Sequence, residues 1–270
     1  MAQYKVVITD FGSSENELEA DEFRRSGLDV ALVRLNAKTP DELLPTILDA
    51  DGLIVQWTTI NRDLLRALQK CRVISRYGIG VDMIDLAAAG ECGIPVCNTP
   101  DYCIDEVSTH TLSFVLMLNR HILPQHRHVQ AGKWGSPSPT PPSRLSQQTV
   151  GVVGMGNIGR VVVRKLLAFG VKVLVYDPYI TPEGAAAAGV EQVGLDELLR
   201  RSDYVSLHCP LTEETRHLIG TAQLQAMKPS AYLINMARGP IGRRYRDARA
   251  RLVSATSHRF LQRKCRENGT

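Results

Sequence analysis

Short runs of apolar residues alternate with amphipathic stretches along the first hundred residues of the chain. The apolar runs predict strands at residues 4–8, 30–33, 52–56, 73–75 and 95–97. The stretches between them have apolar side chains at helical spacing and predict helices at 15–25, 41–48, 62–69 and 85–89. Strands that alternate with helices in this way form right-handed βαβ units around a parallel sheet.

A second α/β series follows the first. Apolar residues three and four positions apart predict one helix over 104–122, which leads the chain into this second unit. Residues 132–148 are rich in proline, glycine and serine and predict a loop. Strands are then predicted at 149–153, 171–176, 189–193, 204–207 and 232–235, with helices at 157–169 and 196–200.

The pattern stops at residue 241. Of the last thirty residues only ten are apolar, and they follow neither a strand period nor a helix period. Nine lysines and arginines against two acids give residues 241–270 a charge of +7, which leaves −3 for residues 1–240 out of the total of +4. The chain has 270 residues, of which 44% are hydrophobic and 22% charged, so we expect two α/β domains, 1–101 and 102–240, and a basic aperiodic tail, 241–270.

Composition excludes several other classes of protein. The chain enters a strand pattern at once, without an export signal, and its longest membrane-like run, 114–118, is far shorter than the roughly 20 apolar residues that cross a bilayer. Six scattered cysteines form no Cys-x-x-Cys pair, and His121, His126 and His128 lack matching ligands. We therefore expect a cytoplasmic protein with no metal site and no membrane insertion.

Three glycines form the clearest motif. Gly154, Gly156 and Gly159 have G-x-G-x-x-G spacing at the junction of a predicted strand and helix. The first glycine permits a tight turn, the second lets a pyrophosphate approach the backbone, and the third lets the helix pack on the strand. Asp177 ends the next strand, 21 residues after Gly156, where a carboxylate can accept hydrogen bonds from ribose and repel a 2′-phosphate. The pattern favours NAD over NADP. The alternative is a glycine turn in an α/β domain that binds no nucleotide.

Five segments in order carry a family resemblance: RYGIGVD at 76–82, CNTP at 97–100, TVGVVGMGNIG at 149–159, LHCPLT at 207–212 and NMARG at 235–239. Over residues 4–241 the chain resembles the D-isomer-specific 2-hydroxyacid dehydrogenases, within them the bacterial C-terminal-binding-protein-like branch near phosphoglycerate dehydrogenase. The resemblance implies a flavodoxin-like substrate domain at 1–101 and a Rossmann-type NAD-binding domain at 102–240. It also implies hydride transfer between NAD(H) and the CH–OH group of a small D-2-hydroxy acid.

The resemblance assigns substrate contacts to two places. Backbone N–H groups of Gly78, Ile79 and Gly80 would receive the substrate carboxylate, although their spacing also suits a simple turn after a strand. Arg238 is the predicted catalytic residue, because it follows a strand end and a guanidinium can hold a carboxylate while polarising the adjacent carbonyl. A surface ion pair is the alternative role for Arg238.

The resemblance also assigns residues of the glycine loop, of neighbouring strand ends and of the interdomain helix to the dinucleotide. They are Thr111, Val153, Gly154, Met155, Gly156, Asn157, Ile158, Gly159, Asp177, Cys209, Pro210, Thr215, Met236, Ala237 and Arg238. Met236 stands where the family more usually has threonine.

The proton donor is absent from its expected place. The family uses a histidine with a carboxylate partner, both well beyond the segment that contains Arg238, and residues 242–270 do not continue the family pattern. The resemblance therefore implies that the family's later strands do not follow Ile241, and we interpret residues 242–270 as a frameshift or an alternative end. His258 and Glu267 lack the family's surroundings, and His208 is a weak substitute. We expect weak NADH binding and little turnover.

Three further expectations concern partners. The chain could instead be a non-catalytic, NAD(H)-sensing, corepressor-like interaction protein. The basic tail lacks the helical spacing and interleaved aromatics of a specific nucleic-acid arm, so nucleic-acid binding is not expected. The long helix at 104–122 and the loop with Trp134 predict a homodimer.

Overall fold

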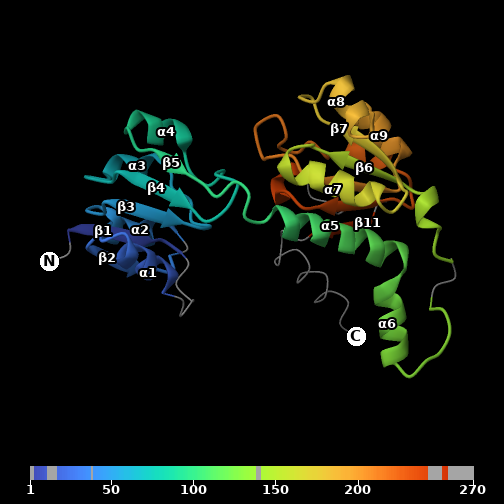
Figure 1. Ribbon diagram of the computed structural model, residues 1–270, viewed down its shortest axis with the longest axis horizontal. Coiled ribbons are helices and arrows are strands. Elements are labelled where there is room, and N and C mark those ends of the chain that lie inside the picture. Colours follow the sequence, from blue (N-terminus) through green and yellow to red (C-terminus); the bar gives the residue numbers. More distant parts are fainter. Residues whose placement is uncertain (1–2, 11–16, 38, 138–140, 243–250, 255–270) are drawn as a thin grey trace. The chain divides into compact units, whose positions relative to one another are not determined.

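The computed structural model describes residues 3–10, 17–37, 39–137, 141–242 and 251–254. The chain divides into two compact units, Met1–Tyr102 and Cys103–Thr270. The sequence analysis places this boundary after residue 101. Each unit contains its own parallel sheet (Figure 1).

The first unit has five strands in the order β2-β1-β3-β4-β5, which is the flavodoxin-like order. Its elements are β1 (Tyr4–Ile8), α1 (Leu18–Arg25), β2 (Val30–Arg34), α2 (Pro40–Ile47), β3 (Gly52–Val55), α3 (Arg62–Ala67), β4 (Val73–Arg76), α4 (Leu86–Glu91) and β5 (Val96–Cys97). Every strand predicted for this half is present. The core forms where side chains of the central strands, such as Val7, Leu53 and Ile74, pack against Leu43 and Ile47 of α2.

The second unit has six strands in the order β11-β10-β9-β6-β7-β8, all parallel, which is the Rossmann order. Its elements are α5 (Ile104–Asn119), α6 (Ile122–Gln130), η1 (Leu145–Gln147), β6 (Thr149–Val153), α7 (Asn157–Leu167), β7 (Lys172–Tyr176), α8 (Pro182–Ala187), β8 (Glu191–Gln192), α9 (Leu195–Arg201), β9 (Tyr204–Leu207), α10 (Thr221–Ala226), β10 (Tyr232–Asn235), η2 (Gly239–Ile241) and β11 (Arg251–Ser254). Buried β6 and β9 lie at the centre of the sheet, and α5 packs against α7 (Figure 1).

The predicted single helix over 104–122 is wrong. α5 ends at Asn119, and His121 has a left-handed backbone with φ 53° before α6 begins at Ile122. A left-handed residue cannot continue a right-handed helix, so the chain turns at this point. Apolar spacing continues across the break and gave no sign of it.

Five further elements were not predicted from the sequence: α8, α10, β11 and the short helices η1 and η2. α8 (PEGAAA) and α10 (TAQLQA) contain a single large apolar residue between them, Leu224, so no amphipathic period shows in the sequence. β11 pairs with β10 from Tyr232↔Arg251 to Asn235↔Ser254, although residues 241–270 were expected to be aperiodic. This strand takes the sixth place of the Rossmann order, so the expectation that no later strand of the family follows Ile241 is wrong.

Candidate functional site: a dinucleotide loop

The glycine loop joins β6 to α7, and its three glycines have different surroundings. Gly154 has φ +93°, and a Cβ on it would lie 2.7 Å from the backbone nitrogen of Cys209. A Cβ on Gly159 would lie 2.1 Å from the carbonyl oxygen of Gly154. At Gly156, the N-cap of α7, a Cβ would meet nothing within 4 Å. Packing therefore requires the first and third glycines, and the second stands in open space at a helix N-terminus, where an anion is favoured.

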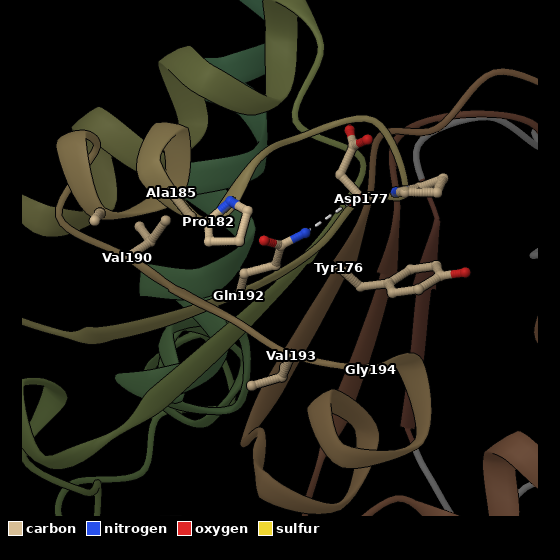
Figure 2. Close-up of a pocket in the computed structure, with 10 residues that line it drawn as sticks. Tyr176, Asp177, Pro182, Ala185, Val190, Gln192, Val193 and Gly194 are labelled. Atoms are coloured by element: carbon tan, nitrogen blue, oxygen red, sulfur yellow. Dashed lines mark hydrogen bonds between the residues drawn. The ribbon is translucent and has the colours of Figure 1, made fainter.

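Asp177 lies directly after β7, next to this loop. Its Oδ2 accepts a hydrogen bond from the backbone N–H of Met155 at 2.6 Å, and its Oδ1 accepts one from Tyr179 at 2.8 Å. The Gln192 amide donates to the carbonyl oxygens of Asp177 and Ile180 at 3.3 and 3.0 Å. The carboxylate and the backbone that carries it are thus fixed before any ligand arrives (Figure 2).

A pocket of about 460 Å³ opens beside Asp177. Figure 2 shows Pro182, Ala185, Val190 and Val193 around it, with the Gln192 side chain between them and Asp177. Its walls therefore combine apolar side chains with the polar groups of Asp177 and Gln192. The sequence analysis did not identify this pocket, because it depends on α8, which was not predicted.

The loop after β9 packs under the glycine turn. The His208 backbone N–H donates to the Val153 carbonyl at 2.8 Å, and His208 Nε2 is 2.8 Å from Ser206 Oγ. Burial lowers the pKa of His208 to about 4 and raises that of Cys209 to about 11. Both side chains are therefore neutral near pH 7, and His208 is poorly suited to donate a proton.

The rest of this loop is held by its own hydroxyl groups. Thr215 Oγ1 donates to the Pro210 carbonyl at 2.6 Å, and it accepts the backbone N–H of Thr212 at 2.8 Å. Two of the predicted cofactor residues, Pro210 and Thr215, are therefore joined in one small turn. The structure gives Thr215 a definite local role, which is to shape this turn.

Arg238 follows β10 in a turn held by Asn235. The Asn235 amide donates to the Arg238 carbonyl and accepts the Ala237 N–H, each at 3.0 Å. Asn235 is 1% exposed, whereas the Arg238 side chain is partly exposed, with its Nη1 3.1 Å from the Ala237 carbonyl. The sequence analysis missed Asn235, although a polar residue that ends a buried strand is a usable signal.

Thr111 was predicted to reach the cofactor. It is fully buried in α5, where its hydroxyl donates to the Val107 carbonyl at 2.8 Å. The structure places the hydroxyl within its own helix, and no hydrogen bond joins it to the glycine loop among the described residues.

The predicted substrate loop lies in the first unit, after β4. Gly78 has φ +135°, and a Cβ on it would lie 1.6 Å from Arg76 Nη1, so this position requires glycine. The Gly78 carbonyl accepts the Thr99 N–H at 3.1 Å, and the Ile79 carbonyl accepts the Asn98 amide at 2.8 Å. These bonds fix the loop from the segment after β5.

Within the part of the chain that the structure describes, no group of three or more His, Cys, Asp or Glu residues could hold a metal ion. No described helix is both long and apolar enough to cross a membrane. His258 and Glu267 lie outside the described residues.

Comparison with known proteins places this geometry in a family. The NAD binding domain of D-isomer specific 2-hydroxyacid dehydrogenases matches residues 112–244. Hydroxypyruvate reductase of Thermotoga maritima is 36% identical over 240 residues, which cover 88% of this chain and 76% of the relative. D-3-phosphoglycerate dehydrogenase of Methanocaldococcus jannaschii is 42% identical over 203 residues, which are 74% of this chain but only 38% of the relative.

A solved structure agrees with the sequence matches. The D-lactate dehydrogenase of Aquifex aeolicus, crystallised with NAD and lactic acid, superposes with a TM-score of 0.82 at 27% identity, and covers 98% of this chain and 81% of that one. The glycine loop, the fixed Asp177 and the Rossmann strand order thus occur in a chain that belongs to the D-isomer specific 2-hydroxyacid dehydrogenase family.

Proposed function

We propose that this chain is an NAD-dependent oxidoreductase that transfers a hydride between NAD(H) and a small D-2-hydroxy or 2-oxo acid. The observation that carries the proposal is the Asp177 carboxylate, which is fixed to the Met155 N–H at the mouth of the glycine loop. The chain spans 38% of the length of the phosphoglycerate dehydrogenase from Methanocaldococcus jannaschii but 76% of the hydroxypyruvate reductase from Thermotoga maritima. Hydroxypyruvate and glyoxylate are therefore the first substrates to test.

The residues of the loop fit NAD. Gly156 leaves open space at the N-terminus of α7, where backbone N–H groups and the helix dipole favour a pyrophosphate. Asp177 accepts hydrogen bonds from ribose hydroxyls, and its negative charge disfavours a 2′-phosphate. Bound NAD would supply or accept the hydride.

Two segments of the chain are proposed to contact the substrate. Arg238 is proposed to bind the substrate carboxylate and polarise its carbonyl, since its turn is fixed by Asn235 and its side chain is partly exposed. The Gly78, Ile79 and Gly80 backbone is proposed to donate N–H groups to a substrate carboxylate. These roles need a proton donor as well, and the neutral His208 does not suit that task.

One titration tests the proposal. NADH and NADPH are added to the chain and binding is followed by nucleotide fluorescence, and glyoxylate or hydroxypyruvate is then added to measure NADH oxidation. We expect NADH to bind more tightly than NADPH. Equal affinity for both nucleotides, or no binding of either, would contradict the assignment of Asp177.

The state of His208 also favours a second candidate, a non-catalytic protein that binds NAD(H) and signals its presence. A chain can bind the nucleotide at its glycine loop without having a residue suited to proton transfer. NADH binding with no oxidation at any concentration of 2-oxo acid would favour this candidate.

We also propose that the chain forms a homodimer through α6 and the loop after it. Ile122, Leu123 and Val129 of α6 are 48%, 44% and 60% exposed, and Trp134 is 95% exposed. Large apolar side chains gathered on one short segment are typical of a protein interface. The five described cysteines are free, which fits the reducing cytoplasm in which we expect the protein to act.

A further inference from the structure

His208 joins three parts of the dinucleotide loop. Its backbone N–H bonds to the last residue of β6, and its carbonyl carbon would lie 3.0 Å from a Cβ on Gly154. Its own Cβ would lie 3.8 Å from a Cβ on Gly159, in the first turn of α7. Gly154 therefore has no free space toward the backbone of His208, and a shift of this backbone would move the glycine turn.

The imidazole itself is anchored on one side. Its Nε2 is 2.8 Å from the hydroxyl of Ser206, which is fully buried on β9. Its Nδ1 is buried and has no hydrogen-bond partner among the described residues. Ser206 is thus the hydrogen-bonding group in the described structure that sets the orientation of the ring.

We infer that His208 is a positioning residue for the dinucleotide, and that the Ser206–His208 hydrogen bond holds the glycine turn at the place where pyrophosphate binds. The inference rests on the proposed binding of NAD, and it gives His208 a role other than proton transfer. His208 acts through Gly154, and no contact between His208 and the ligand is required.

Three variants and a double variant test the inference. Ser206→Ala removes the partner of the ring, and His208→Phe keeps the bulk of the ring without the hydrogen bond. Each should weaken NADH binding about 3- to 10-fold, which corresponds to the net value of one hydrogen bond. Because both changes remove the same bond, the double variant should lose no more than either single variant. Ser202→Ala is the matched control, since Ser202 is also fully buried but caps α9 and has no hydrogen-bond partner for its hydroxyl.

A second measurement keeps the inference separate from NAD binding itself. In ¹⁵N-resolved NMR spectra without nucleotide, the amide signals of Gly154, Met155 and Gly156 should move in Ser206→Ala and stay in place in Ser202→Ala. If the unmodified chain fails to bind NADH, the proposed function is wrong, but the amide signals still test whether the Ser206–His208 hydrogen bond holds the glycine turn. Unchanged signals together with unchanged NADH affinity in a folded Ser206→Ala variant would overturn it, and so would additive losses in the double variant.

Discussion

Asp177 Oδ2 accepts the backbone N–H of Met155 at 2.6 Å, so the proposed ribose ligand also holds the loop that would bind the pyrophosphate. One side chain thereby links two parts of the dinucleotide site. Its other oxygen accepts the Tyr179 N–H at 2.8 Å, which orients the carboxylate before ligand binding. Such preorganisation lowers the entropic cost of binding.

Asp177→Ala should weaken NADH binding on the order of 10- to 100-fold, because charged hydrogen bonds worth roughly 1.5 to 3 kcal/mol are lost. The affinity for NADPH should fall less, since the repulsion between Asp177 and the 2′-phosphate also disappears. The preference for NADH over NADPH should therefore shrink. Fluorescence titration with both nucleotides measures this. Asp196→Ala changes an exposed carboxylate on α9 and serves as the control. Unchanged affinity for both nucleotides would remove Asp177 from the site.

Alanine at the second and third glycines should have different consequences. Gly156→Ala adds a methyl group to open space, so thermal stability should change little while NADH affinity falls, because the methyl group occupies the path of the pyrophosphate. Gly159→Ala forces a methyl group within 2.1 Å of the Gly154 carbonyl and should also cost roughly 1–3 kcal/mol of unfolding free energy. Melting curves and NADH titrations of both variants check this. Equal loss of stability in the two variants would contradict the assigned surroundings.

Most strands could be predicted because central strands of parallel sheets are continuous apolar runs. Asp177 could be predicted because an acidic residue at the end of the next strand, about 20 residues after the glycine motif, is part of the dinucleotide-binding pattern. The sequence analysis missed the hydrogen bond from Met155 to Asp177, since no pattern records which N–H a carboxylate accepts. The surroundings of the His208 ring were equally invisible, because its contact with Ser206 and the burial of its Nδ1 depend on tertiary packing. The break at His121 depends on a single left-handed residue, which apolar spacing does not encode.

Acid should destabilise the fold through His208. Its pKa is about 4 when folded, against an ordinary value near 6.5, so the unfolded chain binds more protons between these values. The unfolding free energy should therefore fall as the pH drops from about 6.5 toward 4, by roughly 2–3 kcal/mol from this group. Denaturant unfolding of the unmodified chain and of His208→Gln at pH 7 and pH 4.5 measures the difference. His110→Gln, at an exposed position on α5, is the control, and an equal acid effect in both variants would count against the lowered pKa of His208.

The proposed dimer depends on the apolar side chains of α6. Val129→Asp places a charge at a 60% exposed position and should convert a dimer into a monomer, because an unpaired charge in an apolar contact is costly. Light scattering at micromolar concentration gives the mass. Leu28→Asp, at a 47% exposed position in the first unit, should leave the mass unchanged. A monomeric mass for the unmodified chain would refute the proposal.

A variant of Arg238 can distinguish substrate binding from nucleotide binding. The turn that contains Arg238 is held by Asn235, whose amide bonds the Arg238 carbonyl and the Ala237 N–H at 3.0 Å each, so Arg238→Gln should leave the backbone in place. The neutral His208 is poorly suited to donate a proton, and general acid catalysis contributes roughly 10²- to 10⁴-fold, so we expect slow NADH oxidation with glyoxylate or hydroxypyruvate in the unmodified chain.

Arg238→Gln should abolish this residual oxidation and weaken NADH binding less than Asp177→Ala does, since the main proposed contact of the guanidinium is with the substrate carboxylate. Asp177→Ala should have the opposite effects. It should lower NADH affinity strongly and lower the rate of NADH oxidation at saturating NADH only slightly. The two variants are compared by steady-state NADH oxidation, with affinity measured alongside by fluorescence. If Arg238→Gln turned over at the unmodified rate, Arg238 would have no role in the substrate site, and the carboxylate would have to be bound by other residues.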